Sequence, residues 1–351
     1  MKNKKMTMKN VKLGNKWVGD DYPCYIVAEI GTAYKNFQEG KKLIDAGLEI
    51  GVDAIKIQTF EAETITTKNN FLDLEETGFV LQYELFKKLE ISKEEQLKVV
   101  KYANEKNMPI FSAPSHINDL EIMKQMNLSF YKTGSDLACH IPLLTELGNL
   151  GKPIIISTGM CDMNDVKEAV STIQETGNEQ IIIMHCVSDY PLKPEDANLS
   201  VMQRLKEKFQ IPVGFSDHSI GILTCLAAAA FGANIVEKHL RHTENTPSPD
   251  DIHSLSVEEF KKLVNDIRYF EKTKGSGIKE PTLSELKNRL TSRVSIIATN
   301  DIPKGSKINN NVVDVRRPGT GIPPKFLSEI IGKTTLKEIK KDQPLSFNDL
   351  Q

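Results

Sequence analysis

The sequence predicts a (β/α)8 barrel followed by a small β-rich domain. Between residue 25 and about residue 270, short β-branched runs alternate with longer amphipathic runs, which is the order of elements in a parallel-sheet protein. Eight such pairs within about 245 residues match the size of a (β/α)8 barrel. A doubly wound open sheet is the alternative, but no G-x-G-x-x-G motif follows the first predicted strand. We therefore expect the barrel.

The predicted strands are the apolar segments at 25–30, 54–59, 109–113, 130–134, 153–159, 180–186, 212–218 and 235–240. The predicted helices between them include 38–51, 92–107, 164–177 and 256–270. Two of these helices begin with the S-x-x-E pattern of a capping box, Ser92 with Glu95 and Ser256 with Glu259.

The character of the chain changes after residue 270. We expect a barrel domain with a short N-terminal extension at 1–271, a Gly- and Lys-containing linker at 272–288 and a second domain at 289–351. Within the second domain, 300–313 and 337–350 share an acid-Ile-x-Lys core followed by a turn and an apolar residue. This repeat predicts a small β-domain with internal two-fold symmetry.

Composition excludes several classes of function. The net charge of −2 and the hydrophobic content of 39% favour no nucleic-acid or membrane partner. The five cysteines contain no C-x-x-C pair, so we expect a reduced, cytoplasmic protein without a cysteine zinc site. The basic first ten residues lack the apolar segment of a secretory signal.

Charged residues interrupt the predicted core strands near their C-terminal ends. In the last strand, Glu237 and His239 are two residues apart and therefore share one face, opposite Lys238. The same spacing pairs Lys56 with Gln58. At least six of the eight strands carry an ionisable or hydroxyl residue near the C-terminal end, where barrel active sites lie. Buried charges need partners or ligands, so we expect the active site there.

The residue types indicate the chemistry. His218 and His239, on adjacent strand ends, suit a catalytic divalent metal with open positions. Lys56 and Lys132 either extend along apolar surface or, with nearby serines, hold an anion. The carboxylates of the first and last strands either neutralise these lysines or act in acid–base chemistry. His140 and His253 we interpret as structural histidines.

With these residues, the sequence resembles the sialic acid synthase family, whose members condense phosphoenolpyruvate with N-acetylmannosamine or a related sugar. The resemblance covers nearly the whole chain. Its motifs are AEIG (28–31), DAIKIQTF (53–60), YKTGSD (131–136), ISTGM (156–160), HCVSDYP (185–191), GFSDHSIG (214–221), VEKHL (236–240), PSPDDIHSL (247–255) and RRPGTGI (316–322). The second domain resembles the antifreeze-like (SAF) domain of that family.

The resemblance implies a set of site residues. A divalent ion, Mn²⁺ or Mg²⁺, would bind to His218 and His239. The catalytic residues would be Glu29, Glu237, Lys56 and Lys132. The residues that bind the two substrates would be Gln58, Ser135, Ser157, Ser188, Tyr190, Ser216, Asp250 and Arg317. Arg317 would reach the N-acyl group of the sugar from a partner subunit, which implies a domain-swapped homodimer.

The chain departs from the family pattern around the sugar. It has TAYKN (32–36) where an Asn-His-x-Gly loop is usual and SAPSH (112–116) where Ser-Thr-Pro-Phe-Asp is usual. Ser188 stands where Asn is frequent, and Pro-Ser-Pro-Asp-Asp replaces Pro-Gly-Pro-Asp-His. By the resemblance, the product would therefore be a sialic, legionaminic or pseudaminic type of nonulosonic acid. One alternative is a catalytically altered member of the family that acts as a sugar-binding or regulatory protein. The other is a 3-deoxy-2-keto acid synthase that acts on another aldose.

Overall fold

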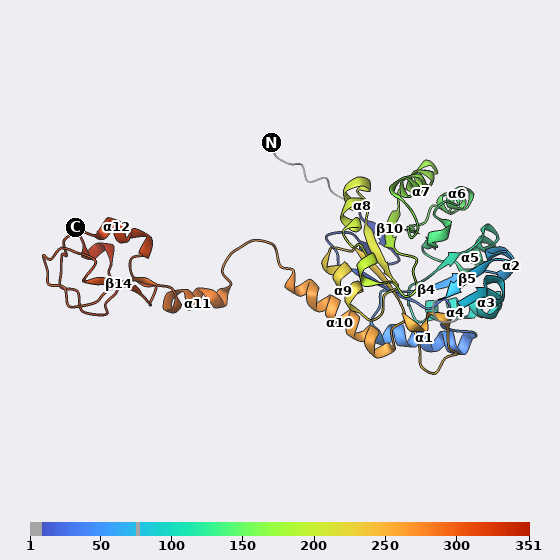
Figure 1. Cartoon of the computed structure of the whole chain (residues 1–351), viewed down its shortest axis with the longest axis horizontal. Coiled ribbons are helices and arrows are strands. Elements are labelled where there is room, and N and C mark those ends of the chain that lie inside the picture. Colours follow the sequence, from blue (N-terminus) through green and yellow to red (C-terminus); the bar gives the residue numbers. More distant parts are fainter. Residues whose placement is uncertain (1–8, 75–77) are drawn as a thin grey trace. The chain divides into compact units, whose positions relative to one another are not determined.

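The computed structural model describes residues 9–74 and 78–351 of the chain (Figure 1). The chain divides into two compact units, one ending at Lys274 and the other running from Gly275 to Gln351. The first unit holds the barrel, and the second holds the predicted repeat. No helix of the described part is both long enough and apolar enough to cross a membrane.

Eight parallel strands form one sheet in the first unit. They are β3 (Tyr25–Glu29), β4 (Ala54–Thr59), β7 (Ile110–Pro114), β8 (Tyr131–Thr133), β9 (Ile154–Ser157), β10 (Ile181–Cys186), β11 (Val213–Asp217) and β12 (Ile235–His239). The hydrogen-bonded order is β7-β4-β3-β12-β11-β10-β9-β8. The end strands β7 and β8 lie side by side, and the ring centroids of Phe111 and Phe130 are 4.5 Å apart. The sheet is therefore a nearly closed barrel, as predicted, and all eight predicted strands are present.

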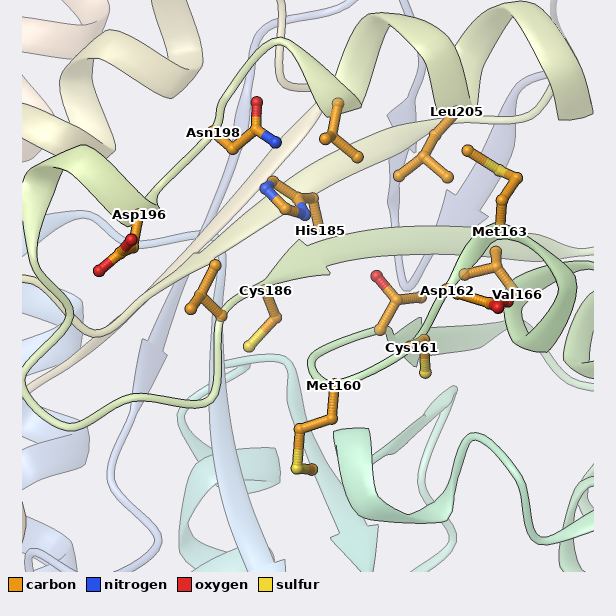
Figure 2. A pocket seen from close by; sticks show the side chains of 13 residues that line it. Met160, Cys161, Asp162, Met163, Val166, His185, Cys186, Asp196, Asn198 and Leu205 are labelled. Carbon is orange, nitrogen blue, oxygen red and sulfur yellow. The ribbon is translucent and has the colours of Figure 1, made fainter.

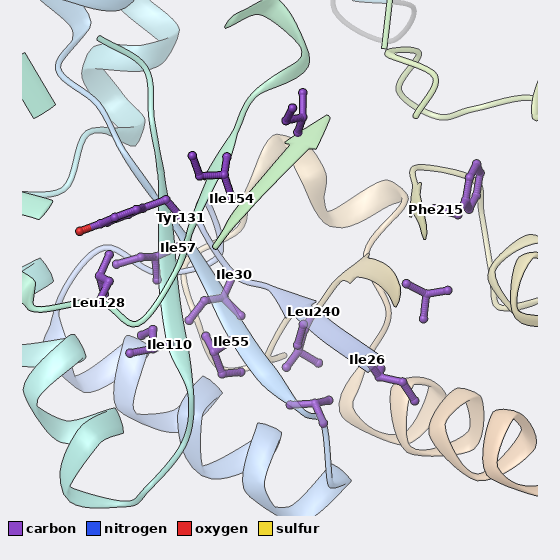
Figure 3. Close-up of a cluster of buried hydrophobic side chains, with 14 of the residues drawn as sticks. Ile26, Ile30, Ile55, Ile57, Ile110, Leu128, Tyr131, Ile154, Phe215 and Leu240 are labelled. Carbon is purple, nitrogen blue, oxygen red and sulfur yellow. The ribbon is translucent and has the colours of Figure 1, made fainter. Parts of the chain in front are cut away.

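Helices follow the strands and cover the outer face of the barrel (Figure 1). They are α1 (Phe37–Ile50), α2 (Ala62–Ile65), α3 (Gln82–Leu89), α4 (Lys93–Glu105), α5 (Leu120–Met126), α6 (Ile141–Asn149), α7 (Met163–Glu175), α8 (Val201–Phe209), α9 (Leu223–Ala230) and α10 (Val257–Thr273). Alternate strand residues such as Ile26, Ile55 and Ile110 face these helices and form the outer core (Figure 3).

The two predicted capping boxes differ in outcome. At α10 the box is complete, because Ser256 accepts from Glu259 N and the Glu259 carboxylate accepts from Ser256 N. At α4, Ser92 caps the helix as predicted. The Glu95 carboxylate, however, accepts from the backbone N–H of Phe37 at the start of α1, so it ties two helices together instead of completing the box.

Apolar side chains fill the N-terminal part of the barrel interior. The strands contribute inward-facing residues such as Tyr25, Ala54, Phe111 and Ile235, and β3 and β10 contribute two residues each. A hairpin that the sequence did not predict, β1 (Val11–Leu13) with β2 (Lys16–Val18), adds Val11, Leu13 and Val18 to the same cluster. The strand starts therefore meet a closed apolar layer, and the polar inward-facing residues lie beyond it at the C-terminal end. A second unpredicted hairpin, β5 (Phe71–Leu74) with β6 (Gly78–Leu81), follows β4.

The second unit contains α11 (Leu283–Ser292), β13 (Ser295–Ala298), β14 (Val313–Arg316) and α12 (Leu327–Ile330). The two copies of the predicted repeat pair with each other. Ile302 N donates to Ile339 O at 2.8 Å, and Ile339 N donates to Ile302 O at 2.9 Å. Three residues after each isoleucine, Gly305 and Asp342 adopt a left-handed conformation with φ of 82° and 63°. The predicted linker at 272–288 includes the end of α10 and the start of α11.

One buried ion pair lies on the helix-facing side of the barrel. Lys238 Nζ is 2.9 Å from Asp217 Oδ2, and Lys238 also donates to the carbonyl oxygen of Ser219. Both charged side chains are at most 1% exposed. This pair explains why a lysine stands between Glu237 and His239 without facing the barrel interior.

We predict that Lys238→Met lowers the free energy of unfolding of the barrel unit by about 3–5 kcal/mol, because it leaves Asp217 buried and unpaired. Urea denaturation followed by circular dichroism measures this change. The double variant Asp217→Leu/Lys238→Met removes both charges and should regain most of the loss. A double variant as unstable as the single one would contradict the pairing.

Candidate functional site

The alternation of side chains brings the predicted site residues together at the C-terminal end of the barrel. Each lies on the inward-facing series that continues the apolar layer, so β3 contributes Glu29, β4 contributes Lys56 and β12 contributes Glu237. Lys132, Ser157 and Ser216 come from β8, β9 and β11 in the same way. All six side chains are buried.

Two lysines and two carboxylates form a connected ionic network. Lys56 Nζ lies 2.8 Å from Glu237 Oε1 and 3.0 Å from Glu29 Oε2. Lys132 Nζ lies 3.3 Å from the same oxygen of Glu237. Ser216 Oγ donates to that oxygen at 3.1 Å, and Gln58 Nε2 donates to Glu29 Oε1 at 2.9 Å. Buried charges are tolerated here because each has an opposite partner.

The network shifts the pKa values of its two carboxyl groups in opposite directions. Burial raises the pKa of Glu29 above its usual range, and Lys56 offsets only part of this effect. Burial also opposes the charge of Glu237, but Lys132 and Lys56 outweigh it and lower its pKa to about 2. Burial lowers the pKa of Lys132, whereas Glu237 and Glu29 raise that of Lys56 despite its burial.

Apart from Glu29 Oε2, which Lys56 Nζ approaches at 3.0 Å, two buried oxygens at the network have no hydrogen-bond partner among the described residues, Ser157 Oγ and Glu237 Oε2. Native proteins satisfy nearly all buried polar groups with protein, water or ligand. These oxygens face the barrel interior beside the lysines, so they are available to a bound molecule.

Two histidines lie next to this network, as predicted. His239 ends β12 and His218 follows β11, with ring centroids 5.5 Å apart. His218 Nδ1 lies 3.0 Å from the carbonyl oxygen of Val187. A carbonyl can only accept, so Nδ1 carries the proton and Nε2 keeps a lone pair for a ligand. Burial lowers the pKa of His218 to about 3 and that of His239 well below its usual value, so both rings are neutral at pH 7.

The loop after β12 adds two further groups. Asp250 Oδ2 lies 3.4 Å from His239 Nδ1, and Asp250 Oδ1 lies 3.9 Å from His253 Nε2. Ligand atoms of these three residues are all within 4.8 Å of one another. Neither ring nitrogen of His253 has a hydrogen-bond partner among the described residues, so its interpretation as a structural histidine stays a prediction. His140, in contrast, caps α6 through Leu143 N, as a structural histidine does.

These residues fit a divalent metal ion. Neutral imidazoles and a carboxylate are the ligands of catalytic metal sites. Outer partners orient them, as is usual at such sites: Thr32 donates to Asp250 Oδ2, and Ser248 donates to Thr32 at 2.9 Å. Of the two predicted ligands, His239 belongs to this group of three residues, whereas His218 lies outside it, with its ring centroid 5.5 Å from that of His239. A metal ion shared by His218 and His239 therefore remains a prediction.

The remaining predicted residues surround Gly159 and the histidines. Gly159 N donates to Ser135 Oγ at 3.0 Å, and a Cβ at Gly159 would stand 2.2 Å from Ser188 Oγ. The loops after β8, β9 and β10 therefore converge here, and a Cβ at Gly159 would require the Ser188 and Ser135 side chains to move. Tyr190 is 48% exposed, and its ring centroid is 4.2 Å from that of His218.

Arg317 belongs to the second unit and is exposed. Its neighbour Arg316 is held within that unit by Asp314 at 3.0 Å and Asp342 at 3.3 Å. The role of Arg317 at a site stays a prediction.

Sequence reasoning misses some features of the HCVSDYP motif. His185 faces away from the barrel interior and lines a cavity of about 350 Å³ with residues of α7 and α8, such as Val166 and Leu205 (Figure 2). Its Nε2 donates to Ala197 O at 2.9 Å, which makes it structural. Cys186 lies on the inward-facing series, 3.9 Å from His218 Nδ1. The alternation of side chains along β10 would have been enough to predict that Cys186 faces the barrel interior.

Comparison with known proteins places this architecture among sugar-acid synthases. Residues 43–279 match the model described as the NeuB family, and residues 293–351 match that of the SAF domain. The chain is 36% identical to the N,N'-diacetyllegionaminic acid synthase of Legionella pneumophila, covering 91% of this chain and 92% of the relative. It is 32% identical to the pseudaminic acid synthase of Campylobacter jejuni, covering 97% and 100%. A crystal structure of the N-acetylneuraminic acid synthetase of Leptospira borgpetersenii in complex with citrate superposes with a TM-score of 0.71 and 31% identity, covering 80% of this chain and 95% of that one.

We predict that the metal-free protein binds Mn²⁺ and that His239→Ala weakens this binding at least about tenfold, since a ligand is lost from a site of few ligands. Isothermal titration calorimetry measures the affinity. His116→Asn is the control, because His116 only caps a short helix and Asn serves the same purpose. Unchanged affinity in His239→Ala would contradict the metal assignment.

Proposed function

The chain belongs to the NeuB family and has a SAF domain at residues 293–351, and we propose that it condenses phosphoenolpyruvate with an N-acyl amino sugar. The products would be a nonulosonic acid and phosphate. The observation that carries the proposal is the meeting of two lysines, Lys56 and Lys132, with Glu237 and His239 in one buried barrel mouth. Relatives named legionaminic and pseudaminic acid synthases support it.

The lysines would bind phosphoenolpyruvate. This substrate carries a carboxylate and a phosphate ester, about −2.5 to −3 charges in total. In the free site, the two lysines are matched by two carboxyl groups, so the network alone has little net positive charge to offer. Ser157 and Ser216 add hydroxyl groups on the same side, and Ser135 lies at the adjoining loop.

A divalent ion, Mn²⁺ or Mg²⁺, held by His218 and His239 would supply the missing positive charge and act as a Lewis acid toward the aldehyde of the open-chain sugar. Because Nδ1 of His218 donates to the carbonyl oxygen of Val187, its Nε2 has a free lone pair that would bind the ion. Asp250, beside His239, would orient the ion or the sugar.

The chemical step would join carbon 3 of phosphoenolpyruvate to the aldehyde carbon of the sugar, whose oxygen takes up a proton. Water then adds to carbon 2, and phosphate leaves from that carbon with cleavage of its C–O bond. Glu29 or Glu237, the two carboxyl groups that contact Lys56, would receive the proton of that water. Lys56 and Lys132 would stabilise the charge of the departing phosphate.

The sugar would lie toward the open side of the site. Tyr190 is an exposed aromatic residue beside His218. Gln58, which donates to Glu29, and Ser188, which lies next to Gly159, would also contact the sugar. Arg317 would contact the N-acyl group from the SAF domain of a partner subunit, in a domain-swapped homodimer. The reaction would take place in the cytoplasm.

We predict phosphate release when the protein is incubated with phosphoenolpyruvate, Mn²⁺ and an unphosphorylated N-acyl sugar from a panel of hexosamines and their deoxy derivatives. Lys132→Met should lower kcat/KM about 10²–10³-fold, the loss expected for removing one charge-stabilising group. Lys101→Met, on an exposed helix face, should be unaffected. Absence of release with every unphosphorylated amino sugar would refute the proposal.

We further predict that Arg317→Ala raises KM for the sugar and leaves KM for phosphoenolpyruvate unchanged, whereas the matched control Arg316→Ala changes neither. Mixing Arg317→Ala with His239→Ala tests the subunit exchange. In a heterodimer one site combines an intact barrel with an intact arginine. At sugar concentrations far below the KM of Arg317→Ala, where neither variant alone is active, about a quarter of the wild-type activity should therefore return. A mixture that stays inactive would argue against the swap.

A further inference from the structure

His253 is an unusual residue for a buried position. Its side chain is 1% exposed, yet neither ring nitrogen has a hydrogen-bond partner among the described residues. Leaving a buried polar group unpaired is unfavourable, so a purely structural role does not account for a histidine here. An apolar residue of similar size would fill the same space at lower cost.

The loop holds this ring in a defined place. Residues Pro249–Ile252 form a short helical turn with a complete capping box, in which Ser248 pairs with Asp251. Asp251 is thereby engaged in the turn. His253 N and Ser254 N both donate to Asp250 O, at 3.3 Å and 3.0 Å. Two residues after His253, Leu255 forms a parallel β-bridge with Leu240, which directly follows β12.

The ring points into the group of ligand atoms already described. Its centroid lies 4.7 Å from that of His239 and 5.8 Å from that of His218, and His253 Nε2 lies 3.9 Å from Asp250 Oδ1. Ligands bound at about 2.0–2.2 Å to one ion lie at most about 4.4 Å apart. The 4.8 Å within which His239, Asp250 and His253 place their ligand atoms needs only a small side-chain adjustment.

We propose that His253 is a third imidazole ligand, which together with His218, His239 and Asp250 makes a nitrogen-rich site that prefers Co²⁺, Zn²⁺ or Fe²⁺ to Mg²⁺. Imidazole nitrogens suit these transition metals, whereas Mg²⁺ favours oxygen ligands and keeps its water. An octahedral ion with four protein ligands retains open positions for substrate. The inference rests on the metal site of the proposed function, but its readouts are metal binding and stability and require no turnover.

The first measurement separates a ligand from a structural residue. A structural histidine stabilises the fold without metal, so its loss would lower the thermal midpoint of the metal-free protein. His253→Leu removes two unpaired nitrogens from the interior, and we expect the metal-free variant to unfold at the same or a higher temperature than the wild type. The rise in midpoint that Co²⁺ produces in the wild type should shrink in the variant.

The second measurement identifies the bond. Calorimetry with Co²⁺ and Mg²⁺ should show the Co²⁺ affinity falling about 10–100-fold in His253→Leu with little change for Mg²⁺, while His116→Asn changes neither. Electron spin echo spectroscopy of the bound Mn²⁺ form should detect three coordinated imidazole nitrogens in the wild type and two in the variant. Equal nitrogen counts, or an unchanged preference between Co²⁺ and Mg²⁺, would overturn the proposal. Phosphate release by the wild type would still support the synthase reaction in that case, so the two failures are distinguishable.

Discussion

Successive side chains of a barrel strand point to opposite faces, and the rest of this structure depends on that alternation. Strand β12 shows it along five residues. Ile235 belongs to the apolar interior layer, Val236 packs under the helices, and Glu237 joins the ionic network. Lys238 turns outward to Asp217, and His239 turns inward to the histidine cluster. One short strand thus contributes to the core, to the stability of the outer wall and to the site.

Buried charges are paired differently on the outer and inner faces of the barrel sheet. Outside, Lys238 and Asp217 form a closed pair whose groups are fully engaged with each other and with neighbouring backbone. Inside, Glu237 accepts from three groups on one oxygen while its other oxygen stays without a partner. The closed pair serves packing, since both charged side chains have partners and neither is more than 1% exposed. The open network has that capacity, and this distinguishes a site from a structural ion pair.

The loop after β12 links this network to metal chemistry. It places Asp250 and His253 next to His239, while Thr32, from the loop after β3, fixes the carboxylate. Two anionic substrate groups entering a nearly neutral network would need additional positive charge, and neutral imidazoles are suited to hold the ion that supplies it. Metal preference and phosphoenolpyruvate binding are therefore expected to depend on the same few side chains.

The barrel, its eight strands and the face on which Glu29, Lys56 and Glu237 lie could be predicted from the amino-acid sequence, because the period of two is a local property of the chain. The sequence also indicated the two-fold repeat of the second unit. Only the tertiary structure decided the partners of those charges, the engagement of Lys238, the hairpin that closes the N-terminal end of the barrel, and the position of His253. These features depend on contacts between segments far apart in the sequence or on loops, where no period tells which way a side chain points.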